Sequence, residues 1–147
     1  MGWQTRATRG AARGVIAAMA MSGLRRMTTA LNLVGQTPPE SILREGAPAV
    51  FYRVPVERRA ALVEAMHWSY GALGGAMFGL LPRRLRRHPL AGPVYGLVFW
   101  TGFQFVIAPV FGLPQSRRVH PAEVLALLGD HVLYGVVVAS SPWPHED

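Results

Sequence analysis

The sequence contains no cysteine and no lysine, and charged residues are scarce. Without cysteine, the chain has no disulfide, no thiolate zinc site, no iron–sulfur ligand and no cysteine nucleophile. Only 16% of the residues are charged, whereas soluble domains carry roughly 25%. Half of the residues are hydrophobic, which excludes a disordered chain. Together these features indicate that lipid surrounds much of the protein.

All 15 basic residues are arginines, and the net charge is +7. A basic excess is typical of proteins that bind nucleic acid or anionic lipid. Here the arginines lie mostly in the breaks between apolar runs, which favours a membrane protein and argues against nucleic-acid binding. The lysine-free use of Ala, Gly, Pro and Arg indicates a bacterium with a GC-rich genome.

Four apolar runs predict four membrane-spanning helices. They cover residues 14–35, 60–81, 91–113 and 121–141. Each run has about the 20 residues needed to cross a hydrocarbon core. Backbone groups in lipid must pair within their own segment, so the runs should be helices. We expect an all-α fold, a four-helix transmembrane bundle, in which residues 1–147 form a single integral membrane domain.

The distribution of arginines predicts the orientation of this bundle. With four spans, both termini and the 82–90 loop share one side, which holds seven arginines against six on the other. The dense Arg83–Arg87 cluster lies in a short loop, where the positive-inside rule is strongest. We therefore expect both termini in the cytoplasm and the protein in a bacterial inner membrane. An anionic-lipid site is a second interpretation of this cluster.

Small residues recur every four positions in the apolar runs, which predicts faces where helices pack closely in lipid. The residues on these faces are Gly14, Ala18, Ser22, Gly71, Gly75, Gly79, Gly135 and Ala139. The second and fourth runs also share the pattern His-x-x-Tyr-Gly, at 67–71 and 131–135. The shared pattern predicts two similar helical hairpins. The same faces are compatible with a homo-oligomer or with docking onto a larger membrane complex.

Polar and ionisable side chains fall at a similar depth in all four runs. Charged groups within a span are costly and seldom face lipid, so they should turn inward and pair. The simplest arrangement pairs Arg25 or Arg26 with Glu64 and Asp130. Arg26 follows the small residues one turn after Ser22, and we expect it to face other helices. The predicted buried polar network comprises Arg25, Arg26, Glu64, His67, Gln104, Asp130 and His131.

His67 and His131 have a second interpretation as axial ligands of a haem. Each is followed one turn later by glycine, which lets a flat macrocycle approach. Glu64 and His67 also form the Glu-x-x-His pair of carboxylate di-iron bundles, but Leu128 stands where a second glutamate would be needed. The sequence holds no Ser-His-Asp order and no phosphate loop, so it predicts no metal site and no catalytic residue.

Several short motifs follow one another along the chain. These are a Gly/Ala-rich helix over Gly14–Gly23, a basic residue, Pro38-Pro39 and the aromatic–glycine motif His67-Trp-Ser-Tyr-Gly71. This layout resembles the YagU-like family of small bacterial inner-membrane proteins. The resemblance implies a location in the cytoplasmic membrane, no established catalysis and a role in acid resistance.

Three functions are therefore open from the sequence. The first is a non-enzymatic membrane protein of envelope stress or acid tolerance, acting by proton-linked conformational change or by passage of an ion or solute. The second is a haem-binding electron-transfer protein that uses His67 and His131. The third is an accessory subunit of a larger membrane complex.

Overall fold

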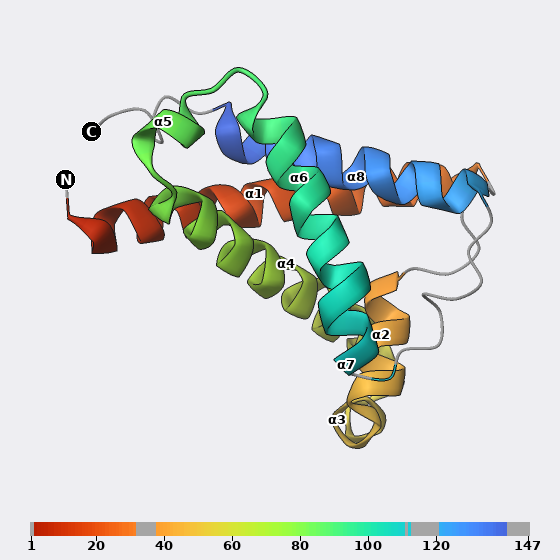
Figure 1. Ribbon diagram of the computed structural model, residues 1–147. Coiled ribbons are helices and arrows are strands. Elements are labelled where there is room, and N and C mark those ends of the chain that lie inside the picture. Colours follow the sequence, from red (N-terminus) through yellow and green to blue (C-terminus); the bar gives the residue numbers. More distant parts are fainter. Residues whose placement is uncertain (1, 32–37, 111, 113–120, 141–147) are drawn as a thin grey trace.

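The computed structural model describes residues 2–31, 38–110, 112 and 121–140, which are almost entirely helical and include no strand. The predicted all-α fold is therefore confirmed. The elements are α1 (Trp3–Ala30), α2 (Pro38–Gly46), α3 (Pro48–Arg53), α4 (Val56–Leu80), α5 (Arg83–Arg86), α6 (Ala91–Gly102), the π-helical turn η1 (Phe103–Ile107), α7 (Ala108–Val110) and α8 (Pro121–Ala139) (Figure 1). Because α6, η1 and α7 follow without a break, one helical rod runs from 91 to 110.

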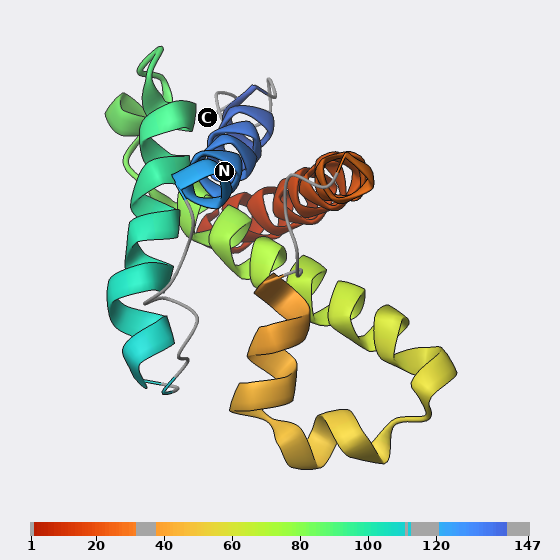
Figure 2. The ribbon, with the colours of Figure 1, turned by 90° about the vertical axis from the view of Figure 1, so that its right-hand side faces the viewer.

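The long helices pack as two pairs that share a central contact. α1 packs most extensively on α4, α6 packs on α8, and α1 also contacts α8. Figure 2 shows α8 between α6 and α1, with α4 passing below them. The short helices α2 and α3 lie beside the N-terminal half of α4 (Figures 1 and 2). The two pairs therefore form one helical body with α1 and α8 at its centre.

Glycine brings the backbones of α1 and α4 into direct contact. A Cβ atom on Gly14 would overlap the carbonyl oxygen of Gly71, and one on Gly75 would overlap that of Gly10. Along the same line, a Cβ on Gly79 would meet the backbone of the first turns of α1. The contacts run in opposite directions along the two helices, so the pair is antiparallel. Small residues that recur every four positions allow two helix backbones to approach each other this closely.

The second pair is built in the same way. A Cβ on Gly135 in α8 would overlap the carbonyl oxygen of Gly92 in α6, and one on Gly96 would overlap the carbonyl oxygen of His131. This pair is also antiparallel. Ala139 lies half-buried beside the hydrophobic core.

Aromatic side chains join the two pairs. The hydroxyl of Tyr134 in α8 donates a 2.6 Å hydrogen bond to the carbonyl oxygen of Gly71, and the hydroxyl of Tyr95 in α6 donates one of 2.6 Å to that of Gly74. Phe99 stacks on Tyr134 with ring centroids 5.2 Å apart. Both tyrosines thus find a polar partner for the hydroxyl inside an otherwise apolar core.

Two of the helices begin before the spans that hydropathy predicts. α1 begins at Trp3 rather than at residue 14, because arginine and alanine are good helix formers and the charges of the first turns do not interrupt a helix. α4 likewise begins at Val56 rather than at residue 60. The expected ends of the first, third and fourth runs, at 35, 113 and 141, lie outside the described residues.

Length and hydropathy single out one candidate span in the described part of the chain. Ala91–Val110 is 20 residues long with a mean hydropathy of 1.4, which suffices to cross a membrane. Val124–Ala139 is apolar but shorter. α1 and α4 include charged residues along their length, so they do not meet the same criterion. By this measure alone, one of the four expected spans qualifies.

Candidate functional site

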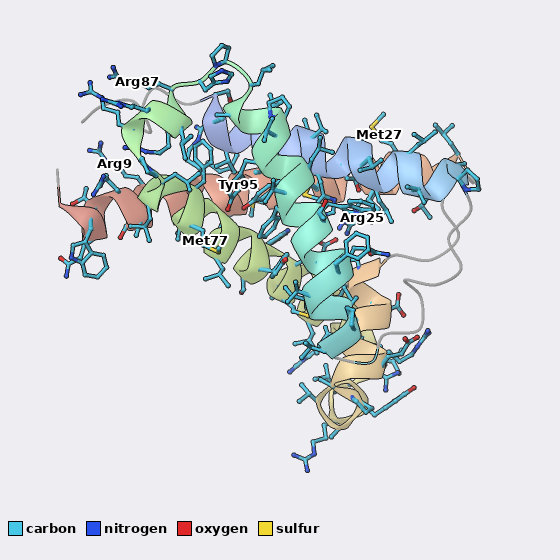
Figure 3. The ribbon with its side chains drawn as sticks, viewed as in Figure 1. Arg9, Arg25, Met27, Met77, Arg87 and Tyr95 are labelled. Atoms are coloured by element: carbon cyan, nitrogen blue, oxygen red, sulfur yellow. The ribbon has the colours of Figure 1, made fainter. Side chains whose placement is uncertain are left out.

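Arg25 and Asp130 form a buried ion pair between α1 and α8. Arg25 Nε lies 3.8 Å from Asp130 Oδ2, and the two side chains are 9% and 7% exposed. Figure 3 shows Arg25 toward the opposite end of α1 from Arg9, beside α8. At 3.8 Å the contact is longer than a hydrogen bond, and Arg25 Nε has no hydrogen-bond partner in the described structure. The pair is therefore held by charge and by the helix packing around it.

A directed series of hydrogen bonds starts at the same arginine. Arg25 Nη2 lies 3.4 Å from His67 Nε2, and His67 Nδ1 lies 3.3 Å from Ser22 Oγ. Ser22 Oγ donates a 2.6 Å bond to Glu64 Oε2. A guanidinium can only donate, so His67 Nε2 must accept, and a neutral ring then carries its proton on Nδ1 and donates it to Ser22. The series runs from a buried cation through imidazole and hydroxyl to a carboxylate.

The carboxylate end of this series reaches the surface of the helix bundle. The side chain of Glu64 is 24% exposed, and Glu64 Oε1 lies 3.8 Å from Arg26 Nη2. Trp68 Nε1 lies 3.4 Å from Ser22 Oγ, to which it donates. The hydroxyl of Ser22 is thus surrounded by two donors and one acceptor, which fixes its own proton toward Glu64.

Arg26 does not belong to the buried part of the network, contrary to the sequence-based expectation. Its side chain is 79% exposed, whereas Arg25 is buried. Each step of four residues turns about 40° past a full helical turn. Four such steps separate Gly10 from Arg26, so Arg26 is rotated by about 160° from the buried face on which Gly10 lies. The buried face of α1 instead follows alternating steps of four and three residues, through Ala18 and Met21 to Arg25.

The remaining predicted members lie near the network or apart from it. His131 is half-buried, and its Nδ1 lies 2.8 Å from the carbonyl oxygen of Leu127 one turn back in α8. Because a carbonyl can only accept, Nδ1 of His131 carries the proton. Gln104 lies half-buried in the π-helical turn η1. Its role in the network stays a prediction.

Two polar members of the network are absent from the set that the sequence predicts. The spacing of small residues places Ser22 on a helix-packing face, and no pattern points to Trp68. A signal for Ser22 is present, since it lies three residues before Arg25 on the same face. Trp68 follows His67 directly, and neighbours in a helix usually diverge. Only the long reach of the indole ring brings its N–H to Ser22.

The arrangement of the histidines does not fit a haem. Both ring nitrogens of His67 lie within hydrogen-bond distance of other side chains, Ser22 and Arg25. An axial ligand must present a nitrogen lone pair to the iron, and the lone pair of His67 faces a guanidinium. In the described ranges, no group of three or more His, Cys, Asp or Glu side chains is placed to hold a metal ion.

Comparisons with models of known protein families, with curated proteins and with solved structures find no match to this chain. The resemblance to the YagU-like family accordingly stays a prediction.

Protons can change the charge balance of this site. In the neutral form His67 accepts from Arg25, but a protonated ring has two N–H donors and no acceptor. Protonation would then set two cations against each other at 3.4 Å in a buried position. The other ionisable groups around His67 come from three helices: Arg25 in α1, Glu64 in α4, and Asp130 and His131 in α8. A proton on His67 would therefore place a repulsion where α1, α4 and α8 meet.

Proposed function

We propose that the protein is a multi-pass helical protein of the bacterial cytoplasmic membrane whose helix packing responds to protons. The relay Arg25–His67–Ser22–Glu64 is the responsive element, and acid tolerance is the physiological role. The observation that carries this proposal is the directed hydrogen-bond series that links a buried ion pair to a partly exposed carboxylate.

The distribution of side chains supports lipid as the surrounding solvent. Charged and polar residues are among the most buried of the described chain: Ser22, Arg25, His67, Arg86 and Asp130. Large apolar side chains are exposed instead, as with Phe105 at 72% and Val110 at 76% on the rod that includes α6. Water-soluble monomers rarely show extended apolar surface of this kind. A helix in lipid shows it as a rule, because its outer face meets hydrocarbon.

The positions of the arginines support an orientation. Arg6, Arg9 and Arg13 in the first half of α1 lie at the same end of the bundle as α5, which holds three more arginines. By the positive-inside rule this end faces the cytoplasm. Glu64 lies on the other half of α4, toward the outer side. A proton from outside would therefore reach Glu64 first and His67 next.

The proton response rests on the imidazole ring of His67, which is neutral at neutral pH and gains a proton in acid. At neutral pH, the neutral ring of His67 joins Arg25 to Ser22 and thereby α1 to α4. At acid pH, a charged ring would lose its bond to Arg25 and repel it. Protonation of Asp130 would weaken the ion pair in the same direction. The packing of α1 on α4 and α8 should therefore loosen as the pH falls.

The test replaces both histidines by glutamine, which hydrogen-bonds without titrating. Survival of cells carrying the double variant His67→Gln and His131→Gln is compared with wild type after exposure to acid medium, together with proton flux into liposomes that contain each protein. We expect the variant to lose the pH dependence of both. Unchanged survival and flux at every pH would contradict the proposal.

A further inference from the structure

The chain makes a corner at residues 47–59, where α3 leads into the start of α4, and this corner exposes apolar side chains. It lies at the opposite end of α4 from α5 (Figures 1 and 2). Val50 in α3 is 51% exposed, Tyr52 is 60% exposed, and Val56 at the start of α4 is 68% exposed. Single exposed apolar residues are normal, but a group of them at one place indicates a contact surface.

Contacts within the corner hold α3 against the first turns of α4. Phe51 is 4% exposed and faces inward. The guanidinium carbon of Arg59 lies 5.0 Å from the ring centre of Phe51 and 5.4 Å from that of Tyr52, within the range of cation–π contacts. Arg59 Nε also donates a 3.1 Å hydrogen bond to the carbonyl oxygen of Val54. The outward position of Val50 and Tyr52 therefore follows from the fold of the corner.

Charged side chains alternate with the apolar ones on this surface. Arg53, Glu57 and Arg58 are all exposed. The exposed arginines outnumber the glutamate, so the corner carries an excess of positive charge that complements lipid phosphate. Long arginine side chains can keep the charge in water while neighbouring apolar groups enter hydrocarbon, and tyrosine is enriched at membrane–water boundaries. This mixture is typical of a surface that lies in a membrane interface.

The length of α4 places the corner at such a boundary. α4 has 25 residues and is therefore about 37 Å long, whereas the hydrocarbon core is about 30 Å thick. Charged groups are costly within hydrocarbon, and the first turns of α4 hold Glu57, Arg58 and Arg59, whereas residues 65–80 hold no Asp, Glu or Arg. We therefore expect α4 to leave the hydrocarbon at its first turns, beside α3.

We propose that this corner is an interfacial anchor in the outer leaflet of the membrane. Val50, Tyr52 and Val56 lie among the glycerol groups and first methylene groups of the phospholipids, and Arg53 and Arg58 lie at the level of the phosphates. The inference rests on the membrane location and the orientation proposed above. Lipid fits this surface better than a protein partner, because the cores of protein interfaces are depleted in charged residues.

The test measures the depth of single side chains in the full-length protein. The chain has no cysteine, so Val50→Cys and Val56→Cys can each carry one nitroxide label in liposomes of phosphatidylethanolamine and phosphatidylglycerol. Collision rates of the label are measured by electron paramagnetic resonance with oxygen, which concentrates in lipid, and with a nickel chelate, which stays in water. We expect both labels to collide more often with oxygen than with nickel.

Glu57→Cys is the matched control, because Glu57 is exposed and directly follows Val56. Consecutive residues of a helix point about 100° apart, so this label should stay in water. Its nickel collision rate should be several-fold higher than the rates at Val50→Cys and Val56→Cys. Equal melting temperatures of the labelled proteins check that each variant folds. Equal nickel collision rates at all three positions would overturn the proposal and leave the corner facing water.

Val98→Cys separates this proposal from the membrane location itself. Val98 lies within α6 and is 61% exposed, so its label should report hydrocarbon and have the lowest nickel collision rate. Contact with water at Val98 would contradict the membrane location on which the anchor depends. Hydrocarbon at Val98 together with water at Val50 and Val56 would defeat the anchor alone.

Discussion

Arg25 and Asp130 lie 105 positions apart in the sequence, yet their charged atoms meet at 3.8 Å in the interior of the bundle. Asp130→Asn keeps the shape of the side chain but removes the charge opposite Arg25. We expect it to lower the free energy of unfolding by about 3 kcal/mol, because an uncompensated buried cation remains. Denaturant titration in micelles, followed by tryptophan fluorescence, measures this change.

The control for that prediction is Arg26→Gln. Arg26 also lies 3.8 Å from a carboxylate, that of Glu64, but its side chain is 79% exposed. Exposed ion pairs contribute little, so the loss should stay below about 1 kcal/mol. Equal destabilisation by the two variants would show that the burial of Arg25 does not matter.

The glycine contact between α1 and α4 predicts a strong position dependence for alanine. Gly75→Ala places a methyl group against the carbonyl oxygen of Gly10. The helices must then separate, at a cost of about 1–3 kcal/mol typical of overpacking. Gly23→Ala in α1 meets nothing within 4 Å, and it should stabilise the helix by up to about 1 kcal/mol. Thermal unfolding in detergent compares them, and a stabilised Gly75→Ala protein would refute the contact.

Removing the hydroxyl of Tyr134, which joins the two helix pairs, should lower the stability less than the changes above. Tyr134→Phe removes the 2.6 Å hydrogen bond to the carbonyl oxygen of Gly71 while keeping the ring and its stacking. The net loss should be about 1 kcal/mol, the usual contribution of one hydrogen bond. Tyr52→Phe serves as control, since Tyr52 is 60% exposed and should change the melting temperature very little.

Ser22 allows the relay to be cut without removing an ionisable group. Ser22→Ala keeps a small side chain at the helix contact but breaks the link between His67 and Glu64. We expect the acid response of proton flux to weaken while the protein stays folded at neutral pH. Ser69→Ala is the control, because its hydroxyl bonds only to the carbonyl oxygen of Ala65 in its own helix. If both serine variants respond to acid like wild type, the relay has no role in the response.

The sequence predicts the candidate site best where a charged side chain within an apolar segment needs a partner. Few places in an apolar chain can satisfy a buried charge, and this restriction alone points to Arg25, Glu64, His67 and Asp130. The need to pair buried charges does not tell which of Arg25 and Arg26 is buried. That depends on how the contact face rotates around α1 along the helix. That rotation is set by the crossing of α1 with α4, which no local pattern specifies.

The helix ends are harder to predict than the glycine faces. Hydropathy places the start of the first span at Gly14, although helix formation needs only good helix formers and begins at Trp3. The contact faces are visible in the sequence because glycine spacing itself determines how closely two backbones approach.

The central claim is that acid loosens the contact between α1 and α8 at the Arg25–Asp130 pair. The chain has no cysteine, so Gly23→Cys and Gly129→Cys, at exposed positions with nothing within 4 Å, can carry two spin labels. The distance between the labels is measured by electron paramagnetic resonance in liposomes, from about pH 7.5 to about pH 3.5, a range wide enough for a buried histidine to gain its proton. The account predicts a second, longer distance that grows as the pH falls and is absent when His67→Gln is added. A single distance that stays the same over the whole range would contradict it.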